Sequence, residues 1–347
     1  MPLHFPVFLI PLLCSLCILA GAPLHAAPPL AADLVRDGQP VNLHAAKFQQ
    51  LFAELQQQHG FTAEALHRIF QGQTINRRVL VLMDKQAESR PYYQYVAHII
   101  TPERIRLGRR HMQTHRALLD RIEARFGVDR EVVVAIWGIE TRFGANQGGF
   151  GVLRTLTTLF DAYPRRSAFF RGELIAFLRL CRETGIDPKA VKGSYAGAFG
   201  QTQFMPSSYL RHAISFDGDS FPDVWKSTPD VLASIANYLR AWGWTLHAPI
   251  YRPLGDTLND ARLIAAHHRG RKATVPLALV RQAQGKMLPD APGNRPVTIV
   301  GLETPPGKQE GGKRYVAGYP NFQAITAWNN SNRYAMAVSE LAEQLAR

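Results

Sequence analysis

The sequence predicts an α+β fold that is mainly helical, with a small β-rich insertion toward its C-terminal end. Apolar residues recur at helical spacing over most of the chain, as in KFQQLFAELQQQHG, where they share one face before Gly60. That periodicity fades between 247 and 320, where Pro and Gly are frequent and RPVTIVGLE and RYVAGY are typical of short strands. The chain has 347 residues, 46% of them hydrophobic, so it can bury a sizeable core.

The helical segments follow one another closely. The pattern is helical from Asn42 to about Phe126, and the stretch from Glu103 to Glu140 is expected to form two helices that break at 126–128. Asp129 is the expected N-cap of the second of these helices. Amphipathic helices are also predicted in ELIAFLRLCRETGID, in STPDVLASIANYLRAWGW, which opens on a capping signal, and in AMAVSELAEQLA.

The first residues are typical of a secretory signal peptide. An apolar run from about Phe8 to Ala20 is followed by small residues, with a cleavage point near Ala26 or Ala27. An uncleaved anchor helix is the alternative, but the run is short and is broken by Pro11. The sequence therefore predicts a cleavable signal peptide and export to the periplasm.

The three cysteines bear on anchoring and on disulfides. Cys14 and Cys17 lie in the signal segment, but each follows Leu, whereas lipid attachment prefers a small residue, so an outer-membrane lipoprotein is the less favoured alternative. Without that segment Cys181 is the only cysteine, and no internal disulfide can form.

The formal net charge of +13 suits an acidic partner. Nucleic acid, an anionic lipid surface and a cell-wall polymer that bears peptide carboxylates all meet that description. The chain has no dense Lys/Arg run with nucleic-acid spacing, so nucleic acid is not a predicted partner.

Glu140 stands out because it ends the apolar run VVVAIWGIE, which is hydrophobic around the whole helical circumference. Burial disfavours the carboxylate anion, and the negative end of the helix dipole acts in the same direction, so the pKa of Glu140 should be raised. A glutamic acid that stays protonated near neutral pH can serve as a general acid. The alternative is a structural ion pair with a core arginine; Arg142, two positions away, points to a different face.

A second informative stretch is KGSYAGAFGQTQFMPSSY. Its glycines leave the backbone bare, which predicts close approach of a bulky ligand, and Ser194, Gln203 and Tyr209 could supply hydrogen bonds. MPSS is a helix start.

These stretches, together with YPRRSAFFRGEL, SIANYLRAWGW and NNSNRYAMAV, resemble the membrane-bound lytic murein transglycosylase B family, glycoside hydrolase family 103. The motifs occur in family order from about Tyr92 to the C-terminus. The resemblance implies a lysozyme-like catalytic core and Glu140 as single acid and base. The expected division is 1–26 signal peptide, 27–119 N-terminal helical region, 120–246 lysozyme-like catalytic core, 247–320 β-rich insertion and 321–347 C-terminal segment completing the cleft.

The resemblance also implies the residues that bind substrate. These are Ser194, Gln203, Arg165, Arg166, Tyr238, Asn329, Tyr334 and, more weakly because Tyr92 and Tyr93 compete with it, Tyr95. Ser194 and Gln203 should orient Glu140 or contact the N-acetyl group of the sugar, and the arginine pair should meet the acidic side of the muropeptide. Core packing is the alternative for the tyrosines, and a solvated helix cap is the alternative for the arginines.

Two departures from the family pattern are visible. Trp328 stands where a tyrosine is common, so ring stacking is expected to replace a hydroxyl contact. Some relatives bind calcium in an EF-hand-like loop, and here SFDGDSFPDVW offers Asp217, Asp219 and Asp223. Counting from Asp217, the twelfth position is Thr228 rather than an acid, so an ordinary Asp-Gly turn is the favoured alternative to this weak calcium site. No cofactor is expected to be required.

The expected function is therefore a lytic transglycosylase that cleaves the bond between N-acetylmuramic acid and N-acetylglucosamine in peptidoglycan and leaves a 1,6-anhydro ring. A hydrolytic muramidase, with Asp161 or another acid activating water, is one alternative. A non-catalytic peptidoglycan-binding protein is the other. Peptidoglycan strands are the expected partner, with proteins of cell-wall synthesis or division as further candidates.

Overall fold

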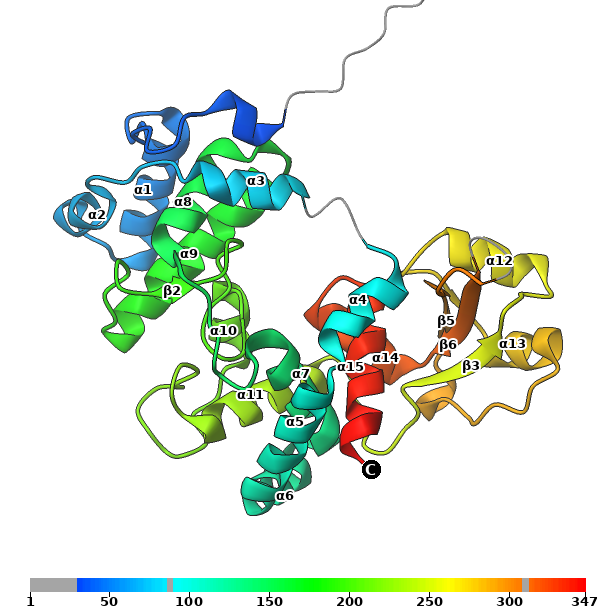
Figure 1. The fold of residues 1–347 in the computed structure, drawn as a ribbon. Coiled ribbons are helices and arrows are strands. Elements are labelled where there is room, and N and C mark those ends of the chain that lie inside the picture. Colours follow the sequence, from blue (N-terminus) through cyan, green and yellow to red (C-terminus); the bar gives the residue numbers. More distant parts are fainter. Residues whose placement is uncertain (1–29, 86–89, 308–311) are drawn as a thin grey trace, which may run out of the picture.

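The computed structural model describes residues 30–85, 90–307 and 312–347 (Figure 1). The predicted signal peptide lies outside these residues. Within the described ranges, no helix is long and apolar enough to cross a membrane.

The helices form two adjoining groups. The N-terminal group lies at the upper left of Figure 1, and the second group, which contains the C-terminal helices, lies below and to its right. The first group consists of α1 (Ala46–His59), α2 (Ala63–Phe70), α3 (Arg77–Lys85), α8 (Val152–Ala162) and α9 (Ser167–Thr184). The second consists of α4 (Tyr92–Ile99), α5 (Pro102–Thr114), α6 (Arg116–Phe126), α7 (Arg130–Thr141), α10 (Pro206–His212), α11 (Thr228–Ala241), α14 (Pro320–Trp328) and α15 (Asn332–Leu345).

The central helix α7 is buried along most of its length, as its apolar sequence predicts. Every residue from Val132 to Gly138 is buried, and α15, α5 and α11 pack against it. Asp129 does occupy the N-cap position, but its side chain does not cap the helix. Its carboxylate accepts hydrogen bonds from Trp244 Nε1 at 2.7 Å and from His247 N instead.

The stretch before α7 contains one helix more than predicted. The single helix expected there is divided at His115 into α5 and α6. His115 lies near the bridge between helical and extended backbone, with φ −104° and ψ 20°, which ends the regular helical hydrogen bonding.

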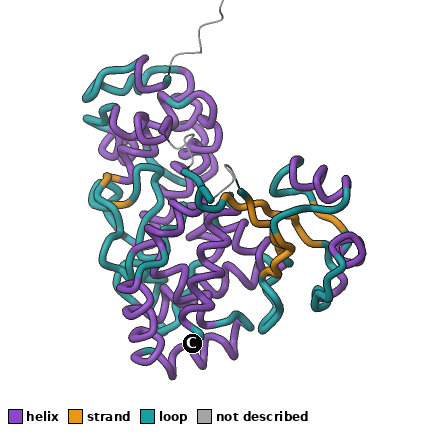
Figure 2. Tube along the Cα trace, turned by 45° about the vertical axis from the view of Figure 1, so that its right-hand side comes forward, coloured by secondary structure: helices purple, strands orange, loops and turns teal. Residues whose placement is uncertain are grey.

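The strands of the larger sheet lie together on one side of the helical body (Figure 2). An antiparallel sheet has the strand order β3-β6-β5-β4, formed by β3 (Tyr251–Gly255), β4 (Thr274–Val275), β5 (Val297–Glu303) and β6 (Lys313–Gly318). The strands β5 and β6 confirm the two that the sequence predicts. A separate two-residue pair joins β1 (Phe150–Gly151) to β2 (Lys192–Gly193).

Both faces of the four-stranded sheet are covered. On β5, Val297 and Ile299 belong to a small core beneath α12 (Ala261–His268) and α13 (Leu277–Gln284). Val300 and Leu302 belong to the main core of the protein. Side chains alternate across a strand, so one strand holds the two cores together.

The loop between α10 and α11 is held by one buried carboxylate. Asp230 is fully buried and accepts hydrogen bonds from the backbone N–H groups of Phe216 (2.6 Å), Asp217 (3.4 Å) and Asp223 (2.7 Å). The predicted cap of α11 is also present, because Ser227 Oγ accepts from Asp230 N. Three backbone positions of the loop are thus held by a single side chain.

We predict that Asp230→Ala lowers the free energy of unfolding by about 3 kcal/mol, because three backbone donors lose their buried acceptor. The measurement is urea unfolding followed by circular dichroism, in the presence of EDTA. The matched control is Asp219→Ala, in the same loop but exposed, which should change the stability by less than about 0.5 kcal/mol. Equal losses in the two variants would contradict this role of Asp230.

Candidate active site

Glu140 lies in the last turn of α7, and a hydrogen-bond network fixes that helix end. Thr141 Oγ donates to the carbonyl of Gln201 and accepts from Gly144 N at 3.0 Å. Gln201 Oε1 accepts from Trp137 Nε1 at 2.8 Å. The position of Glu140 is therefore set by the loop after β2 as well as by its own helix.

Two side chains from the C-terminal helices bind the Glu140 carboxyl. Tyr334 OH donates to Oε1 at 2.5 Å, and Trp328 Nε1 donates to the same oxygen at 2.9 Å. Among the described residues, Oε2 has no hydrogen-bond donor and no arginine pairs with Glu140. The alternative of a structural ion pair thus finds no support in this geometry.

The pKa of Glu140 is raised to about 7, with burial as the main cause. The hydrogen bonds from Tyr334 and Trp328 act in the opposite direction, because they stabilise the anion. This confirms the expected direction of the shift. Near neutral pH the group exists in both forms, and with two donors on Oε1 the proton resides on Oε2, so the carboxyl can either give or take a proton.

Both donors are held firmly in place. Tyr334 is buried near the start of α15, where the N-cap Ser331 accepts from its backbone N–H. The indole of Trp328 packs against the rings of Tyr238 and Phe204, at centroid distances of 4.8 and 5.1 Å. Sequence reasoning assigned stacking to Trp328 and missed its bond to Glu140, although its place beside Asn329 in the family motif was a usable signal.

A cleft of about 770 Å³ lies beside Trp328 and Tyr334, the two donors to Glu140. Its wall includes Tyr95, Arg166, Asn329 and Tyr334, four of the predicted substrate-binding residues, together with Arg90, Phe169, Met205, Trp328 and Arg333. No Asp or Glu is among the described residues that line it. Asp161, the sequence candidate for a second acid, instead pairs with Lys47 at 2.5 Å.

The structure distinguishes Tyr95 from the tyrosines that compete with it. Tyr95 lies on the cleft wall, and its pKa is raised to about 12 by burial and by the nearby charge of Glu140. Tyr92 is buried and donates its hydroxyl to Glu340 at 2.6 Å. The hydroxyl of Tyr93 accepts from Gln94.

The two predicted arginines have different surroundings. Arg166 lines the cleft, where its guanidinium lies 4.3 Å from the ring centroid of Phe169. Arg165 forms an ion pair with Asp84 at 3.5 Å and is not part of the described cleft wall. An adjacent pair in sequence thus supplies one cation to the cleft.

Ser194, Gln203 and Tyr238 bind other parts of the protein. Ser194 Oγ accepts from the N–H groups of Ala196 and Ala198, and Gln203 Nε2 donates to the carbonyls of Gly200 and Gln147. Tyr238 OH donates to the carbonyl of Ala327 at 2.8 Å, one residue before Trp328. The contacts of Ser194 and Gln203 hold the Gly-rich loop in shape, and the contact of Tyr238 holds the backbone next to Trp328.

The glycines of this loop serve the packing of the protein itself, a role that the sequence pattern did not predict. A Cβ on Gly193 would lie 2.2 Å from the carbonyl oxygen of Ala198. Gly197 has φ +88°, and a Cβ there would lie 2.5 Å from Leu156 Cδ2. The bare backbone allows the loop to fold tightly against α8.

Two of the three candidate calcium ligands have carboxylates engaged in local hydrogen bonds. Asp217 accepts from Ser227 Oγ and from Asp219 N, and Asp223 Oδ1 accepts from the N–H groups of Trp225 and Lys226. Asp230 points inward to the backbone donors described above.

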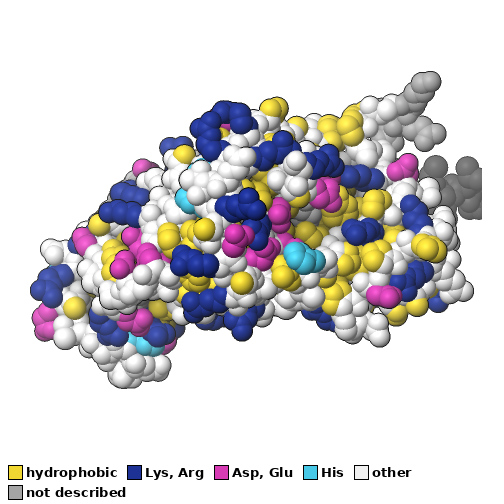
Figure 3. Space-filling model, turned by 90° about the horizontal axis from the view of Figure 1, so that it is seen from below, with side chains coloured by type: hydrophobic (Ala, Val, Ile, Leu, Met, Phe, Trp, Pro, Cys, Tyr) yellow, Lys and Arg dark blue, Asp and Glu magenta, His cyan; other side chains and the backbone are white. Residues whose placement is uncertain are grey.

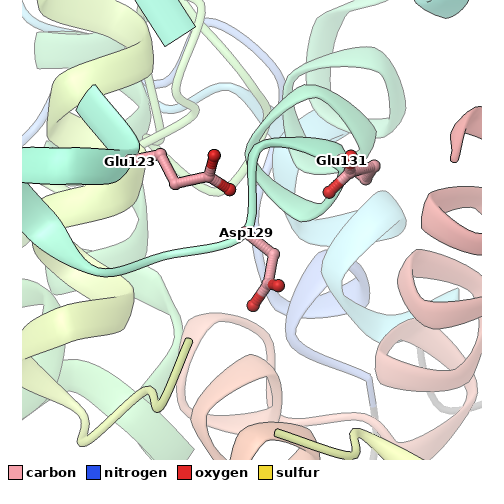
Figure 4. A group of neighbouring side chains, drawn as sticks. All are labelled: Glu123, Asp129 and Glu131. Carbon is pink, nitrogen blue, oxygen red and sulfur yellow. The ribbon is translucent and has the colours of Figure 1, made fainter. Parts of the chain in front are cut away.

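Another acidic group, Glu123, Asp129 and Glu131, lies where α6 passes into α7 (Figure 4). Arg130 neutralises it in part, since Arg130 Nε donates to Glu123 Oε2 at 2.8 Å and the same guanidinium pairs with Asp120. The Asp129 carboxylate is hydrogen-bonded to the side chains of Trp244 and His247. The group therefore connects α6, α7 and the segment after α11.

Positive side chains are spread over the face of the molecule that Figure 3 shows. On the face in Figure 3, Lys and Arg side chains are distributed with Asp and Glu side chains between them. The cations of the cleft wall are Arg90, Arg166 and Arg333. Arg333 pairs with Glu303, and neither of the other two has an acidic partner among the described residues.

A mainly helical, lysozyme-like fold with one carboxyl beside a cleft places this protein in the class of lytic transglycosylases, as comparison with known proteins shows. A transglycosylase SLT domain model matches residues 44–343, and the chain belongs to this family. It is 34% identical over 316 residues to the membrane-bound lytic murein transglycosylase B of Escherichia coli K12, covering 86% of this chain and 82% of the relative.

Two solved structures extend the comparison. The E. coli lytic transglycosylase Slt35 in complex with bulgecin A is 32% identical, with a TM-score of 0.76 over 90% of this chain and 96% of that one. SltB3 from Pseudomonas aeruginosa, in complex with NAG-anhNAM-pentapeptide, is 31% identical, with a TM-score of 0.70 over 86% of this chain and 77% of that one. These similarities confirm the family and the fold class that the motifs predict.

We predict that Glu140→Gln makes the protein more stable above pH 7 than the unchanged chain. With the folded pKa raised to about 7, the folded state keeps its proton after the unfolded chain has lost it. Stability therefore falls as pH rises from about 4.5 to 7, and the uncharged amide avoids this loss of about 1–3 kcal/mol. Melting temperatures from pH 5 to pH 8 measure the difference, which should widen with pH; a constant difference would contradict the raised pKa.

Proposed function

We propose that this chain is a lytic transglycosylase that cleaves the bond from N-acetylmuramic acid to N-acetylglucosamine in peptidoglycan and closes a 1,6-anhydro ring on the muramoyl sugar. One observation carries the proposal: a single carboxyl with its pKa raised to about 7 is bonded to two residues of the cleft wall, Tyr334 and Trp328, and the described wall itself holds no Asp or Glu. The names of the relatives support the substrate class.

Glu140 acts first as an acid. In its protonated form it gives the proton on Oε2 to the oxygen that links the two sugars, and the bond to C1 of the muramoyl sugar breaks. The cation that develops at C1 is stabilised by the 2-acetamido group of the same sugar. The Glu140 anion that remains is stabilised by the hydrogen bonds from Tyr334 and Trp328 to Oε1.

Glu140 then acts as a base. The carboxylate removes the proton of the C6 hydroxyl of the muramoyl sugar, and O6 bonds to C1, which closes the ring and restores the acid. No water is consumed. A pKa near 7 suits both steps, because the energetic cost of giving the proton and that of taking it are then balanced.

The cleft wall supports a glycan with acidic peptide stems. Arg90 and Arg166 present cationic groups that can pair with peptide carboxylates, and Tyr95 and Asn329 offer hydrogen bonds to sugars. Ring faces from Trp328 and Phe169 provide apolar surface for pyranose rings.

A hydrolytic muramidase is less well supported. An ordinary glycosidase uses two carboxyl groups within about 10 Å of each other, one of them to activate water or to attack C1. Asp161 pairs with Lys47 and lies outside the described cleft wall, so it cannot take that part.

The test is mass spectrometry of the fragments released from purified peptidoglycan. We expect anhydro-muramoyl ends that are one water lighter than reducing ends, and we expect their rate of release to fall as pH rises through about 7, because the acid form of Glu140 is lost. Reducing N-acetylmuramic ends would instead establish a muramidase.

The matched variant is Glu140→Gln, which should release fragments at least about 1,000-fold more slowly while it still binds peptidoglycan. Pull-down with insoluble peptidoglycan measures that binding. If Glu140→Gln releases fragments as fast as the unchanged chain, Glu140 is not the acid. If neither protein releases any, the non-catalytic binding protein is the correct alternative.

We also propose export to the periplasm, since peptidoglycan lies there and the first residues are typical of a signal peptide. Proteins of cell-wall synthesis or division are candidate partners, because they act on the same polymer.

A weak calcium site at Asp217, Asp219 and Asp223 is a further proposal, supported by three carboxylates in one short loop. If calcium binds there, millimolar calcium should raise the melting temperature by a few degrees relative to EDTA. Asp219→Ala should abolish that increase. A melting temperature that is the same in calcium and EDTA would contradict the site.

A further inference from the structure

We propose that Glu303 is a positioning residue for the active site, even though it lies on the β-rich insertion and outside the cleft wall. The inference deepens the proposed function and rests on Glu140 being the catalytic carboxyl. Glu303 is the last residue of β5 and binds the starts of α4 and α15 together. These are the helices that bring Tyr95 and Tyr334 to Glu140.

The contact with α4 satisfies a backbone donor at its first residue. The side chain of Glu303 accepts from Tyr92 N at 3.0 Å through Oε2. The N-cap residue of α4 is Pro91, which makes no side-chain cap bond. A carboxylate from another element thus supplies both the acceptor and the negative charge that a helix N-terminus favours. Tyr95 follows one helical turn later.

The contact with α15 is a two-pronged ion pair. Arg333 NH2 donates to Glu303 Oε1 at 2.8 Å, and Arg333 Nε donates to Oε2 at 3.3 Å. Arg333 directly precedes Tyr334, whose hydroxyl binds Glu140. One carboxylate therefore fixes the backbone of α4 and the second residue of α15 at the same time.

A second contact fixes the same start of α4 from the other side. Tyr92 OH donates to Glu340 Oε2 at 2.6 Å, and Glu340 pairs with Arg314 on β6. The pKa of Glu303 is lowered, mainly through its hydrogen bond with Arg333, despite the opposing effect of burial. The carboxylate is thus the form that makes these contacts at neutral pH.

The consequence is that the insertion sets the distance between the tyrosine hydroxyls and Glu140. If Glu303 is lost, both helix starts can move while each helix stays folded. Misplacement of groups around a reacting carboxyl affects turnover more than binding, because the contacts that matter are those made to the charge as it develops.

The test compares Glu303→Ala, which makes neither contact, with Glu303→Gln, whose amide oxygen can still accept from Tyr92 N. Turnover is scored as glycosidic bonds cut, whichever ends form, so the result does not depend on the product proposed above. We expect kcat to fall about tenfold for Ala and less for Gln, with KM within about twofold of the unchanged chain. The matched control is Glu343→Gln, which removes an acid that binds Tyr251 on β3 at the same insertion boundary. It should leave kcat unchanged.

A Tyr95→Phe background separates positioning from general loss of structure. If Glu303 acts through Tyr95, Glu303→Ala should lower kcat by less than about threefold in the Tyr95→Phe background. The same tenfold loss in both backgrounds would overturn positioning through Tyr95, and an unchanged kcat for Glu303→Ala in the unchanged chain would overturn the inference as a whole. Should Tyr95→Phe alone be inactive, the kcat values of the position-303 variants decide: the order Glu, then Gln, then Ala supports the inference, and any other order contradicts it.

Discussion

The hydrogen bonds from Tyr334 and Trp328 to one oxygen of Glu140 are the constraint on which the site depends. Burial alone would favour a permanently neutral acid, and two donors alone would favour a permanent anion. The two effects oppose each other and place the pKa at about 7. Much of the surrounding architecture, from the Gly-rich loop behind α7 to the ring stack beneath Trp328, serves to keep these three side chains in place.

The division of the fold follows from that requirement. The helix α7 carries the acid and is buried among α15, α5 and α11, so it cannot rotate without exposing apolar residues. The four-stranded sheet is attached through a strand that contributes to two cores. The insertion thus contributes to the support of the site, since its Glu303 binds the starts of the two helices that carry Tyr95 and Tyr334.

Short stretches of sequence predicted the features that depend on neighbouring residues along the chain. The apolar run identified α7 and the raised pKa of Glu140, and the stretches RPVTIVGLE and RYVAGY, where helical periodicity fades, identified β5 and β6. The motifs identified the family and four residues of the cleft wall. Contacts between distant segments escaped prediction. The hydrogen bond from Trp328 to Glu140 joins residues 188 positions apart. The Asp129 side chain accepts a hydrogen bond from Trp244 and does not cap its own helix. The role of the glycines in internal packing also escaped prediction, because a bare backbone admits a ligand or a neighbouring side chain equally well in sequence terms.

The bond between Tyr334 and Glu140 joins residues 194 positions apart, and its donor comes from the last helix of the described chain. Contacts of such long range form late in folding. While the polypeptide is being synthesised, Glu140 has neither of its donors and no completed cleft. The carboxyl therefore acquires its two hydrogen-bond donors only when α14 and α15 have docked against α7.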